Sequence, residues 1–230
     1  VRRGGGDGPE AASALAMFLA AVIGAGMLVV GSTVVRRMRQ ARVVRARALP
    51  VRAVVVDRWM EPKDLVVREV PDPAPRRGEV VIEVEAAGCN FFDILLVQGK
   101  YQMKPAFPFT PGAEVAGVVR ELGADVRGVS IGDRVFAGLA LGAFAERVAL
   151  PAASLHAMPD AMTFPEAAAF PVVYPTSYAG LVDRANLRAG ETLLVHAAAG
   201  GVGVAAVQIG KALGARVIAK AGGADKLEVA

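Results

Sequence analysis

Residues 191–220 read ETLLVHAAAGGVGVAAVQIGKALGARVIAK, and this stretch decides the fold of the C-terminal part of the chain. Glu191–His196 is a short apolar run typical of a strand, and residues 197–203 form a glycine-rich turn. Val204–Leu213 has the composition of a helix, and Arg216–Ala219 is a second strand. A strand, a glycine-rich turn, a helix and a strand in this order predict one βαβ unit of a dinucleotide-binding fold.

The glycine-rich turn predicts a binding site for a dinucleotide phosphate. A pyrophosphate that docks on the backbone amides at the start of a helix needs a bare main chain. Side chains at Gly200 and Gly203 would obstruct this approach or the packing of the helix on the strand. The turn residues expected to bind the cofactor are Ala198, Gly200, Gly201, Val202 and Gly203. The alternative is a tight turn that binds nothing.

The residues after the second strand favour NADP(H) over NAD(H). An NAD site places an acidic residue at the end of this strand, where it accepts hydrogen bonds from the ribose 2′-hydroxyl. Here the first carboxylate is Asp225, and Lys220 and Lys226 flank a turn of small residues. We expect these two lysines to attract the 2′-phosphate of NADP(H). The alternative for Lys226 is a solvated lysine at the start of a helix.

The middle of the chain has the pattern of a small β-barrel. Short β-branched runs alternate with Gly and Pro turns, and residues 90–98 favour one helix. Thr163 and Glu166 then predict a capping box at the start of a helix that runs toward residues 178–185. The expected strands of the barrel cover Val51–Val56, Val66–Val70, Glu79–Glu85, Glu114–Glu121, Arg134–Phe136 and Gly142–Leu150.

Composition and charge exclude several classes of protein. Of the 230 residues, 54% are hydrophobic and 21% are charged, which excludes a disordered chain. One cysteine, Cys89, and two histidines exclude a disulfide framework and a multi-cysteine metal site. The net charge of +4 comes from residues 1–50, where eight arginines face two acids, because the remainder has 18 basic and 20 acidic residues. We therefore expect no nucleic-acid partner.

Residues 1–50 contain a candidate transmembrane helix. Residues 11–35 are 25 consecutive uncharged positions, and six arginines follow within residues 36–47. A helix of this length can cross a bilayer, and the arginines would place its C-terminal side in the cytoplasm. Two other interpretations stay open, namely an extension from a misplaced translation start and some other targeting segment.

From Val51 onward the sequence resembles the zinc-free quinone oxidoreductase branch (the ζ-crystallin-like proteins) of the medium-chain dehydrogenase/reductase superfamily. The matching stretches are residues 86–93, 98–101, 108–119, 132–135 and 196–226. The resemblance implies an α/β plus β fold, in which a GroES-like barrel catalytic domain is followed by a Rossmann dinucleotide-binding domain. The expected boundaries are 1–50 for the extension with its apolar helix, 51–160 for the GroES-like domain, and 161–230 for a linker helix and the first part of the Rossmann domain.

The resemblance also implies that the chain is a fragment. Members of this family continue beyond the second Rossmann strand, and this sequence stops shortly after it. We expect a truncated Rossmann domain with an unpaired sheet edge, poor solubility and almost no activity, whereas the full-length form would be a homodimeric reductase.

The same resemblance argues against a metal. Zinc-dependent relatives have a catalytic Cys where this chain has Asn90 and a His where it has Ala113. The cysteine-rich lobe that holds a structural zinc in those relatives is also missing. Without a metal to polarise a carbonyl, hydride transfer needs an acceptor that is already electrophilic, such as a quinone or an α,β-unsaturated carbonyl.

The activity that the resemblance implies is transfer of hydride from NADPH to a quinone. It places Asn90 and Asp93 beside the nicotinamide, Tyr101 in the substrate pocket and Thr176 near the cofactor. Asn90 and Tyr101 are candidate hydrogen-bond donors to the acceptor. Structural alternatives are a helix-surface or buried bonding role for Asp93 and a rim position for Tyr101.

Two other functions stay open. On the same scaffold the enzyme would reduce an enone, an alkenal or an enoyl thioester. From a different class, the chain would be a non-catalytic NADPH-binding protein tethered to a membrane. In each case we expect a cytoplasmic protein, held at the inner face of the membrane if residues 11–35 are an anchor.

Overall fold

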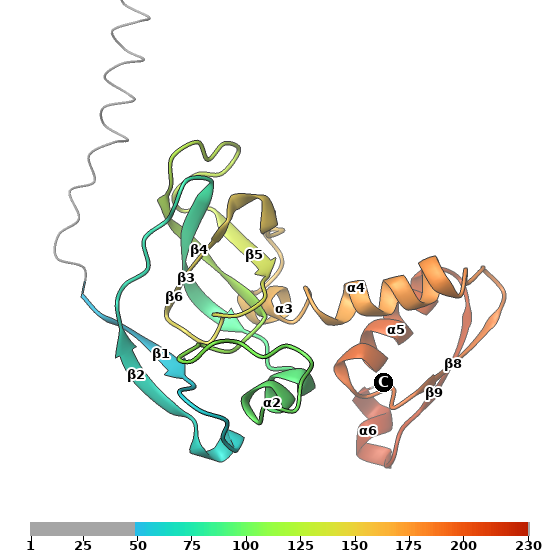
Figure 1. Ribbon diagram of the computed structural model, residues 1–230. Coiled ribbons are helices and arrows are strands. Elements are labelled where there is room, and N and C mark those ends of the chain that lie inside the picture. The colour runs from blue at the N-terminus through green and yellow to red at the C-terminus, as the bar shows by residue number, and fades with distance from the viewer. Residues whose placement is uncertain (1–48, 230) are drawn as a thin grey trace, which may run out of the picture. The chain divides into compact units, whose positions relative to one another are not determined.

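The structure, a computed structural model, describes residues 49–229 (Figure 1). The candidate membrane anchor at residues 11–35, and with it the expected apolar N-terminal helix, lies outside the described residues. Within residues 49–229 no helix is long and apolar enough to cross a membrane.

A five-stranded antiparallel sheet forms the centre of the N-terminal half of the described chain (Figure 1). Its strands lie in the order β6-β3-β4-β5-β7. Bulges between Val81 and Ile82 and after Val84 bend the long pair β3 and β4. The strands are β3 (Glu79–Ala87), β4 (Glu114–Leu122), β5 (Arg134–Gly138), β6 (Arg147–Pro151) and β7 (Leu155–Ala157), with a 3-10 turn at Ala152–Ser154 before β7.

Two differences from the expected strands have clear structural correlates. The strand expected at Gly142–Leu150 begins only at Arg147, because the backbones of Phe144 and Glu146 bind Val54 and Arg52 instead. The sequence of β3 nearly alternates between polar and nonpolar residues, which is typical of a half-buried strand, yet Val80, Val81 and Ile82 are all fully buried. Both faces of the sheet are therefore covered at this point, which an alternating pattern does not predict.

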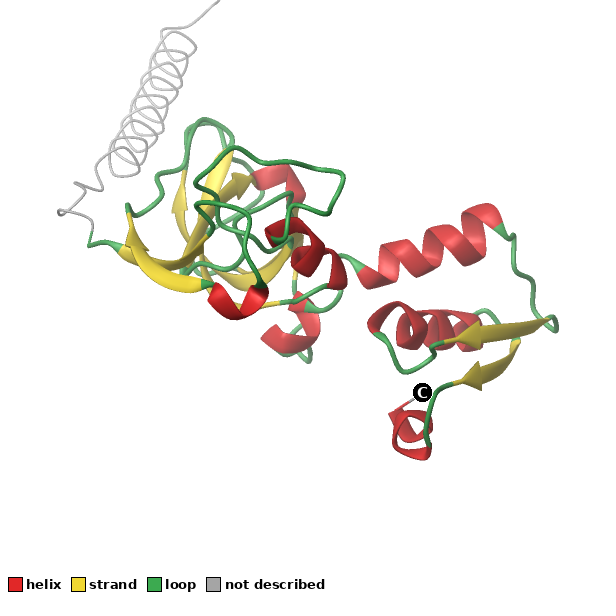
Figure 2. Ribbon diagram, turned by 60° about the horizontal axis from the view of Figure 1, so that its bottom comes forward, coloured by secondary structure: helices red, strands yellow, loops and turns green. Residues whose placement is uncertain are grey.

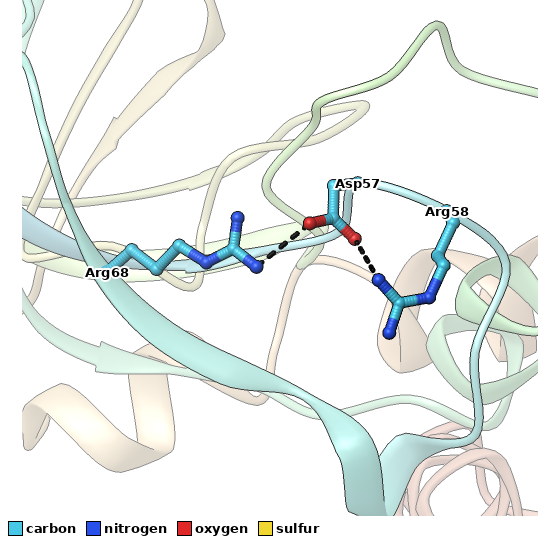
Figure 3. Close-up of polar contacts among 3 residues, drawn as sticks. All are labelled: Asp57, Arg58 and Arg68. Atoms are coloured by element: carbon cyan, nitrogen blue, oxygen red, sulfur yellow. Dashed lines mark hydrogen bonds and ion pairs between the residues drawn. The ribbon is translucent and has the colours of Figure 1, made fainter.

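The β1 (Val51–Val55) and β2 (Val66–Val70) strands form a separate antiparallel ribbon, with a 3-10 turn at Pro62–Asp64 before β2. The Val54 N–H donates to the carbonyl of Phe144 at 2.8 Å, which attaches the ribbon to the loop before β6. Asp57, just after β1, pairs with Arg68 of β2 at 2.9 Å and with Arg58 at 3.3 Å (Figure 3). The neighbouring Arg68 lowers the pKa of Asp57.

The α2 helix (Phe91–Val97) occupies the helical segment expected at residues 90–98. It buries Leu96 and Val97 in one cluster with Val56 and Phe109. Burial of such side chains contributes roughly 1.5–3 kcal/mol each to folding. This packing fixes the position of the N-terminus of α2, which carries two of the expected site residues.

The helix expected from Thr163 toward residues 178–185 is broken into pieces. The α3 helix (Phe164–Ala168) begins at the expected capping box, where the Thr163 N–H donates to the Glu166 carboxylate at 2.8 Å. The chain then passes Pro171 before α4 (Val173–Tyr178), and a π-helical turn continues over Ala179–Arg184. Proline lacks the N–H that a continuous helix needs and restricts the residue before it, which explains the interruption.

The expected βαβ unit is present at the C-terminal end of the described chain. β8 (Thr192–His196) and β9 (Arg216–Lys220) pair in parallel, and α5 (Gly201–Ala212) connects them. The α5 helix covers one face of the pair and α4 lies beside α5 (Figure 2). A short helix, α6 (Ala224–Val229), follows β9. This arrangement places the glycine-rich turn at the carboxyl end of β8, where α/β folds bind ligands.

Candidate functional site

The turn between β8 and α5 presents backbone amides that no side chain caps. Gly200 is the N-cap of α5, with φ −81° and ψ 160°, and no side chain accepts a hydrogen bond from the first turn of the helix. The Gly200 N–H itself donates to the Ala197 carbonyl at 2.9 Å, and Ala197 is left-handed with φ 50°. The first N–H groups of α5 are therefore available to an anion, and the helix dipole favours one there.

Packing inside the protein requires glycine at position 203 and leaves little room for a side chain at position 201. A Cβ on Gly203 would lie 2.7 Å from the Cα of Ala198, which is closer than real contacts allow. A Cβ on Gly201 would lie 3.1 Å from a methyl group of Val173 in α4. Gly203 thus lets the helix approach the turn after β8, as expected, and Gly201 lets α4 approach α5.

Packing inside the protein does not require glycine at position 200. Its φ is negative, and a Cβ there would meet the Ala197 carbonyl oxygen at an ordinary 3.4 Å. The protein itself leaves room for a side chain on the exposed surface of this residue. A bare backbone at this position fits a site where a phosphate approaches the main chain closely.

The other residues expected at the cofactor lie around the same turn. Ala198 is fully buried, and its N–H donates to the Lys220 carbonyl at 3.0 Å. Val202 is 48% exposed in the first turn of α5. Lys220 is the exposed last residue of β9, and Lys226 is exposed in α6. Lys220 is thus joined to the turn by the backbone, while Lys226 lies on a separate element.

Thr176 lies in α4, and its hydroxyl is already used within that helix. It donates to the Val172 carbonyl one turn earlier, at 2.6 Å. The neighbouring Ser177 is buried, and its hydroxyl donates to the Val202 carbonyl at 2.8 Å. The sequence did not single out Ser177, although it is the residue that joins α4 to the glycine-rich turn.

Asn90 and Asp93 are joined at the start of α2. Asn90 is the N-cap of this helix, and its N–H donates to the Asp93 carboxylate at 2.8 Å in a capping box. Asp93 is buried, and its second oxygen, Oδ1, has no hydrogen-bond partner. Burial raises the pKa of Asp93, while the N–H groups of Asn90 and Gly112 partly oppose this rise.

Glu114 is a third member of this cluster, and the sequence reasoning missed it. The first residue of β4, it is 2% exposed, and its Oε1 accepts a hydrogen bond from the Asn90 side-chain amide at 2.7 Å. Its Oε2 accepts from the Val172 N–H at 2.9 Å. Burial raises the pKa of Glu114, opposed by these two donors and reinforced by the charge of Asp93. A glutamate within an apolar strand sequence was the available signal, because such a side chain needs buried partners.

Cys89 precedes this cluster and is exposed. Partial desolvation by neighbouring atoms raises the pKa of its thiol, and the carboxylates of Asp93 and Glu114 raise it further. A raised pKa keeps the thiol protonated and weakly nucleophilic.

Tyr101 is half-buried and packs into the cluster formed by Val56, Leu96 and Phe109. Its ring lies 5.4 Å from that of Phe92 in α2. The aromatic ring therefore contributes to the packing around α2. Its contact with Phe92 places it near the helix that begins with Asn90.

A shallow cavity of about 630 Å³ lies beside Glu114. Its lining includes Ala113, which occupies the position of a zinc-ligating histidine in the zinc-dependent relatives, and Val172, whose N–H binds Glu114. The remaining lining residues are Gly138, Leu139, Ala140, Leu150, Pro151, Ser154 and Pro171. Most of the side chains that line it are nonpolar.

The described residues contain no group of three or more His, Cys, Asp or Glu side chains that could hold a metal ion. The side chain at the first zinc-ligand position, Asn90, is an amide that donates to Glu114, and the second position holds the methyl group of Ala113. Neither side chain is a zinc ligand.

The structure thus gathers some of the expected residues into two groups, whereas Tyr101, Thr176 and Lys226 belong to neither. Asn90 and Asp93 form one group with Glu114, and the glycine-rich turn with Lys220 forms the other. The α4 region contacts both, through Val172 to Glu114 and through Ser177 to Val202.

Comparison with known proteins identifies relatives over much of the described chain. Residues 76–160 match the family model described as the alcohol dehydrogenase GroES-like domain. The chain is 43% identical over 162 residues to the mouse "Synaptic vesicle membrane protein VAT-1 homolog-like", covering 70% of this chain and 39% of that protein.

Two solved structures illustrate the structural likeness. A quinone oxidoreductase from Thermus thermophilus, crystallised also with NADPH, has a TM-score of 0.67 and 42% identity over 76% of this chain and 55% of its own. The CurK enoyl reductase has a TM-score of 0.71 and 33% identity over 78% of this chain and 56% of its own. The chain therefore spans about half or less of the length of these relatives.

Proposed function

Because the chain belongs to the quinone oxidoreductase-type branch of the medium-chain dehydrogenase/reductase superfamily, we propose that the protein is an NADPH-dependent quinone reductase that works without zinc. The observation that carries this proposal is the uncapped turn at the start of α5, where Gly200 keeps the backbone bare although the protein leaves room for a side chain. A pyrophosphate bound there would accept hydrogen bonds from the first N–H groups of α5.

NADPH, when bound, supplies the hydride, and the protein binds and orients the reactants. The Gly200–Gly203 backbone holds the phosphates, and Lys220 at the end of β9 attracts the 2′-phosphate that distinguishes NADPH from NADH. The crystallised complex of the Thermus thermophilus relative with NADPH supports this choice of cofactor.

The group around Glu114 supplies the polar side of the acceptor site. Asn90 presents a carboxamide whose orientation is fixed by Glu114, and the buried carboxylate of Asp93 holds the backbone of Asn90 at the start of α2. Tyr101 offers a half-buried ring and a hydroxyl to a flat acceptor. An acceptor that is already electrophilic needs such hydrogen bonds and no metal.

A second candidate is reduction of an α,β-unsaturated carbonyl, such as an enoyl thioester. The observation in its favour is the similarity to the CurK enoyl reductase, whose fold this chain matches with a TM-score of 0.71. Both reactions deliver a hydride to a conjugated, electron-poor acceptor. A panel of quinones, enones and enoyl thioesters, each assayed with NADPH, separates these two activities.

The proposal is tested by titrating the protein with NADPH in a calorimeter. Saturable binding is expected, and Gly200→Ala should weaken it about tenfold or more because the added methyl group displaces the phosphate from donor N–H groups. Gly180→Ala is the matched control, since a Cβ there meets no atom within 4 Å. Absence of binding, or equal affinity of the Gly200→Ala variant, would overturn the proposal. Binding without turnover on any acceptor would favour the non-catalytic NADPH-binding alternative.

A further inference from the structure

Glu114 is a buried carboxylate that joins two parts of the sequence far from its own. Asn90 lies 24 residues before it and Val172 lies 58 residues after it, yet both donate hydrogen bonds to its two oxygens. The side chain is 2% exposed, so water does not compete for these bonds. A buried charged group with two fixed donors holds its partners in a defined geometry.

The chemistry of the two partners determines which protonation state of Glu114 can bind both of them. The Asn90 amide nitrogen and the Val172 backbone nitrogen are both donors, so each carboxylate oxygen must act as an acceptor. The contact with Glu114 also determines which end of the Asn90 amide carries its nitrogen. Asp93 is the other titratable group whose charge acts on Glu114, and both carboxylates raise the pKa of the neighbouring Cys89 thiol.

The second contact of Glu114 reaches the helix that leads to the glycine-rich turn. Val172 is the N-cap of α4, and five residues later Ser177 donates to the Val202 carbonyl in the first turn of α5. The polar contacts therefore run from Asn90 through Glu114 to the start of α4, and from α4 to the first turn of α5.

We propose that Glu114 is a positioning residue, which holds the side-chain amide of Asn90 in one orientation and ties that orientation to the N-terminus of α4. The inference rests on the proposed function for its catalytic meaning, because Asn90 is there the group that meets the acceptor or the nicotinamide. The positioning itself is a property of the protein without cofactor and is measurable there.

Gly88 provides a way to disturb Glu114 without changing any of the three bonded residues. A Cβ on Gly88 would lie 2.6 Å from the Glu114 carboxyl carbon, so a methyl group must push the carboxylate aside. The displaced side chain is the end of a flexible chain, and the backbone of β4 can stay in place. Gly88→Ala should therefore loosen the bonds to Asn90 and Val172 in a protein that still folds.

The test measures hydrogen exchange of the Val172 N–H and of the Asn90 side-chain amide by NMR, in the absence of cofactor. Glu114→Gln offers only one acceptor oxygen to two donors, so at least one of these groups should exchange about tenfold faster or more. Gly88→Ala should produce the same pattern. Glu166→Gln is the matched control, because Glu166 also accepts a backbone hydrogen bond but lies in the exposed capping box of α3.

A double variant distinguishes coupling from general destabilisation. Asn90→Asp alone places two carboxylates in contact, and Glu114→Gln alone leaves a donor unpaired. In the double variant the donor and the acceptor are exchanged. The side-chain amide at position 114 donates to the carboxylate at position 90, and the amide oxygen at position 114 still accepts a hydrogen bond from the Val172 N–H. The Val172 exchange rate should therefore return to within about threefold of the wild-type rate, a non-additive result expected for groups in direct contact.

A kinetic readout links this geometry to catalysis. In protein that turns over, Glu114→Gln should lower kcat about tenfold to a hundredfold, because misplacement of an orienting group acts on the reaction step. The affinity for NADPH should change less than threefold.

Two outcomes would overturn the inference. One is that Asn90→Asp and Glu114→Gln have additive effects on the exchange rate of the Val172 N–H. The other is that the exchange rates in Glu114→Gln and Gly88→Ala equal those in Glu166→Gln. Failure of NADPH binding in the wild type would instead count against the proposed function.

Discussion

The Cβ that Gly203 lacks would lie 2.7 Å from the Cα of Ala198, so the first turn of α5 rests directly on the backbone that follows β8. The obstacle to a side chain is main-chain atoms, which cannot move aside without displacing the strand. This contact sets the distance between the helix and the turn, and with it the position of the amides offered to a phosphate.

Gly203→Ala should therefore lower the free energy of unfolding by about 1–3 kcal/mol, as other substitutions that overpack a core do. Urea denaturation monitored by circular dichroism measures this change. Gly200→Ala provides the comparison within the same turn, because its Cβ finds an ordinary contact of 3.4 Å. The interpretation of the turn fails if both variants lose the same stability.

Ala197 should tolerate replacement by glycine and gain from it. Its φ of 50° lies in the left-handed region, which costs a residue with a Cβ about 1–2 kcal/mol. Ala197→Gly removes this cost. It also makes the unfolded chain more flexible, which favours unfolding by about 0.5–1 kcal/mol. The variant should be as stable as the wild type or up to about 1 kcal/mol more stable. Thermal unfolding measures the difference, and Ala199→Gly, at a position without positive φ, should destabilise instead.

The pH dependence of stability should reveal the buried carboxylate of Glu114. Burial raises its pKa, so the folded protein binds a proton at this site more tightly than the unfolded chain does. Its contribution to stability is therefore largest at low pH and is lost as the pH rises from the ordinary glutamate pKa of about 4.3 through the raised value. The stability of the wild type relative to Glu114→Gln should fall with rising pH across this window.

Urea denaturation of both proteins between pH 4 and pH 8 checks this expectation. The pKa values of Asp57 and Glu146 are lowered by arginine partners, so these groups contribute stability that is lost as the pH falls. Both groups are present in both proteins, and their effect cancels in the difference. If the free energy of unfolding of the wild type minus that of Glu114→Gln rises with pH, the pKa of Glu114 is lowered in the folded state.

Cofactor preference should depend on Lys220. It is the exposed last residue of β9, at the position where NAD-binding folds place an acidic residue. Lys220→Glu should weaken NADPH binding by about tenfold or more and weaken NADH binding much less, because a carboxylate repels the 2′-phosphate. Parallel titrations with both nucleotides measure the ratio. Lys211→Glu, in the last turn of α5 and away from the glycine-rich turn, is the charge-matched control.

Local patterns in the sequence predicted much of the fold. The strand, glycine-rich turn, helix and strand over residues 191–220 are present as predicted, because each depends on a run of neighbouring residues. The Thr163–Glu166 capping box is present for the same reason. The prediction of one long helix after it was wrong, since Pro171 interrupts the helix between α3 and α4.

The candidate site was only partly predictable. Asn90 and Asp93 were named from a family resemblance, and the structure shows that they also form the capping box of α2. The roles assigned to them, to Tyr101, to Thr176 and to the lysines remain predictions, which the binding and kinetic experiments test. Ser177 and Glu114 were missed because their partners are distant in the sequence.

The sequence by itself determined the order of the elements, the bare turn at the start of α5 and the absence of an acidic residue at the end of β9. These features follow from residue types at short spacing, where backbone conformation and hydrophobic periodicity act. Only the tertiary structure decided that Gly203 is required by packing whereas Gly200 is not, and that Glu114 binds Asn90 and Val172. Contacts between residues 24 and 58 positions apart arise when strands and helices pack together, and no local pattern encodes which side chains then meet.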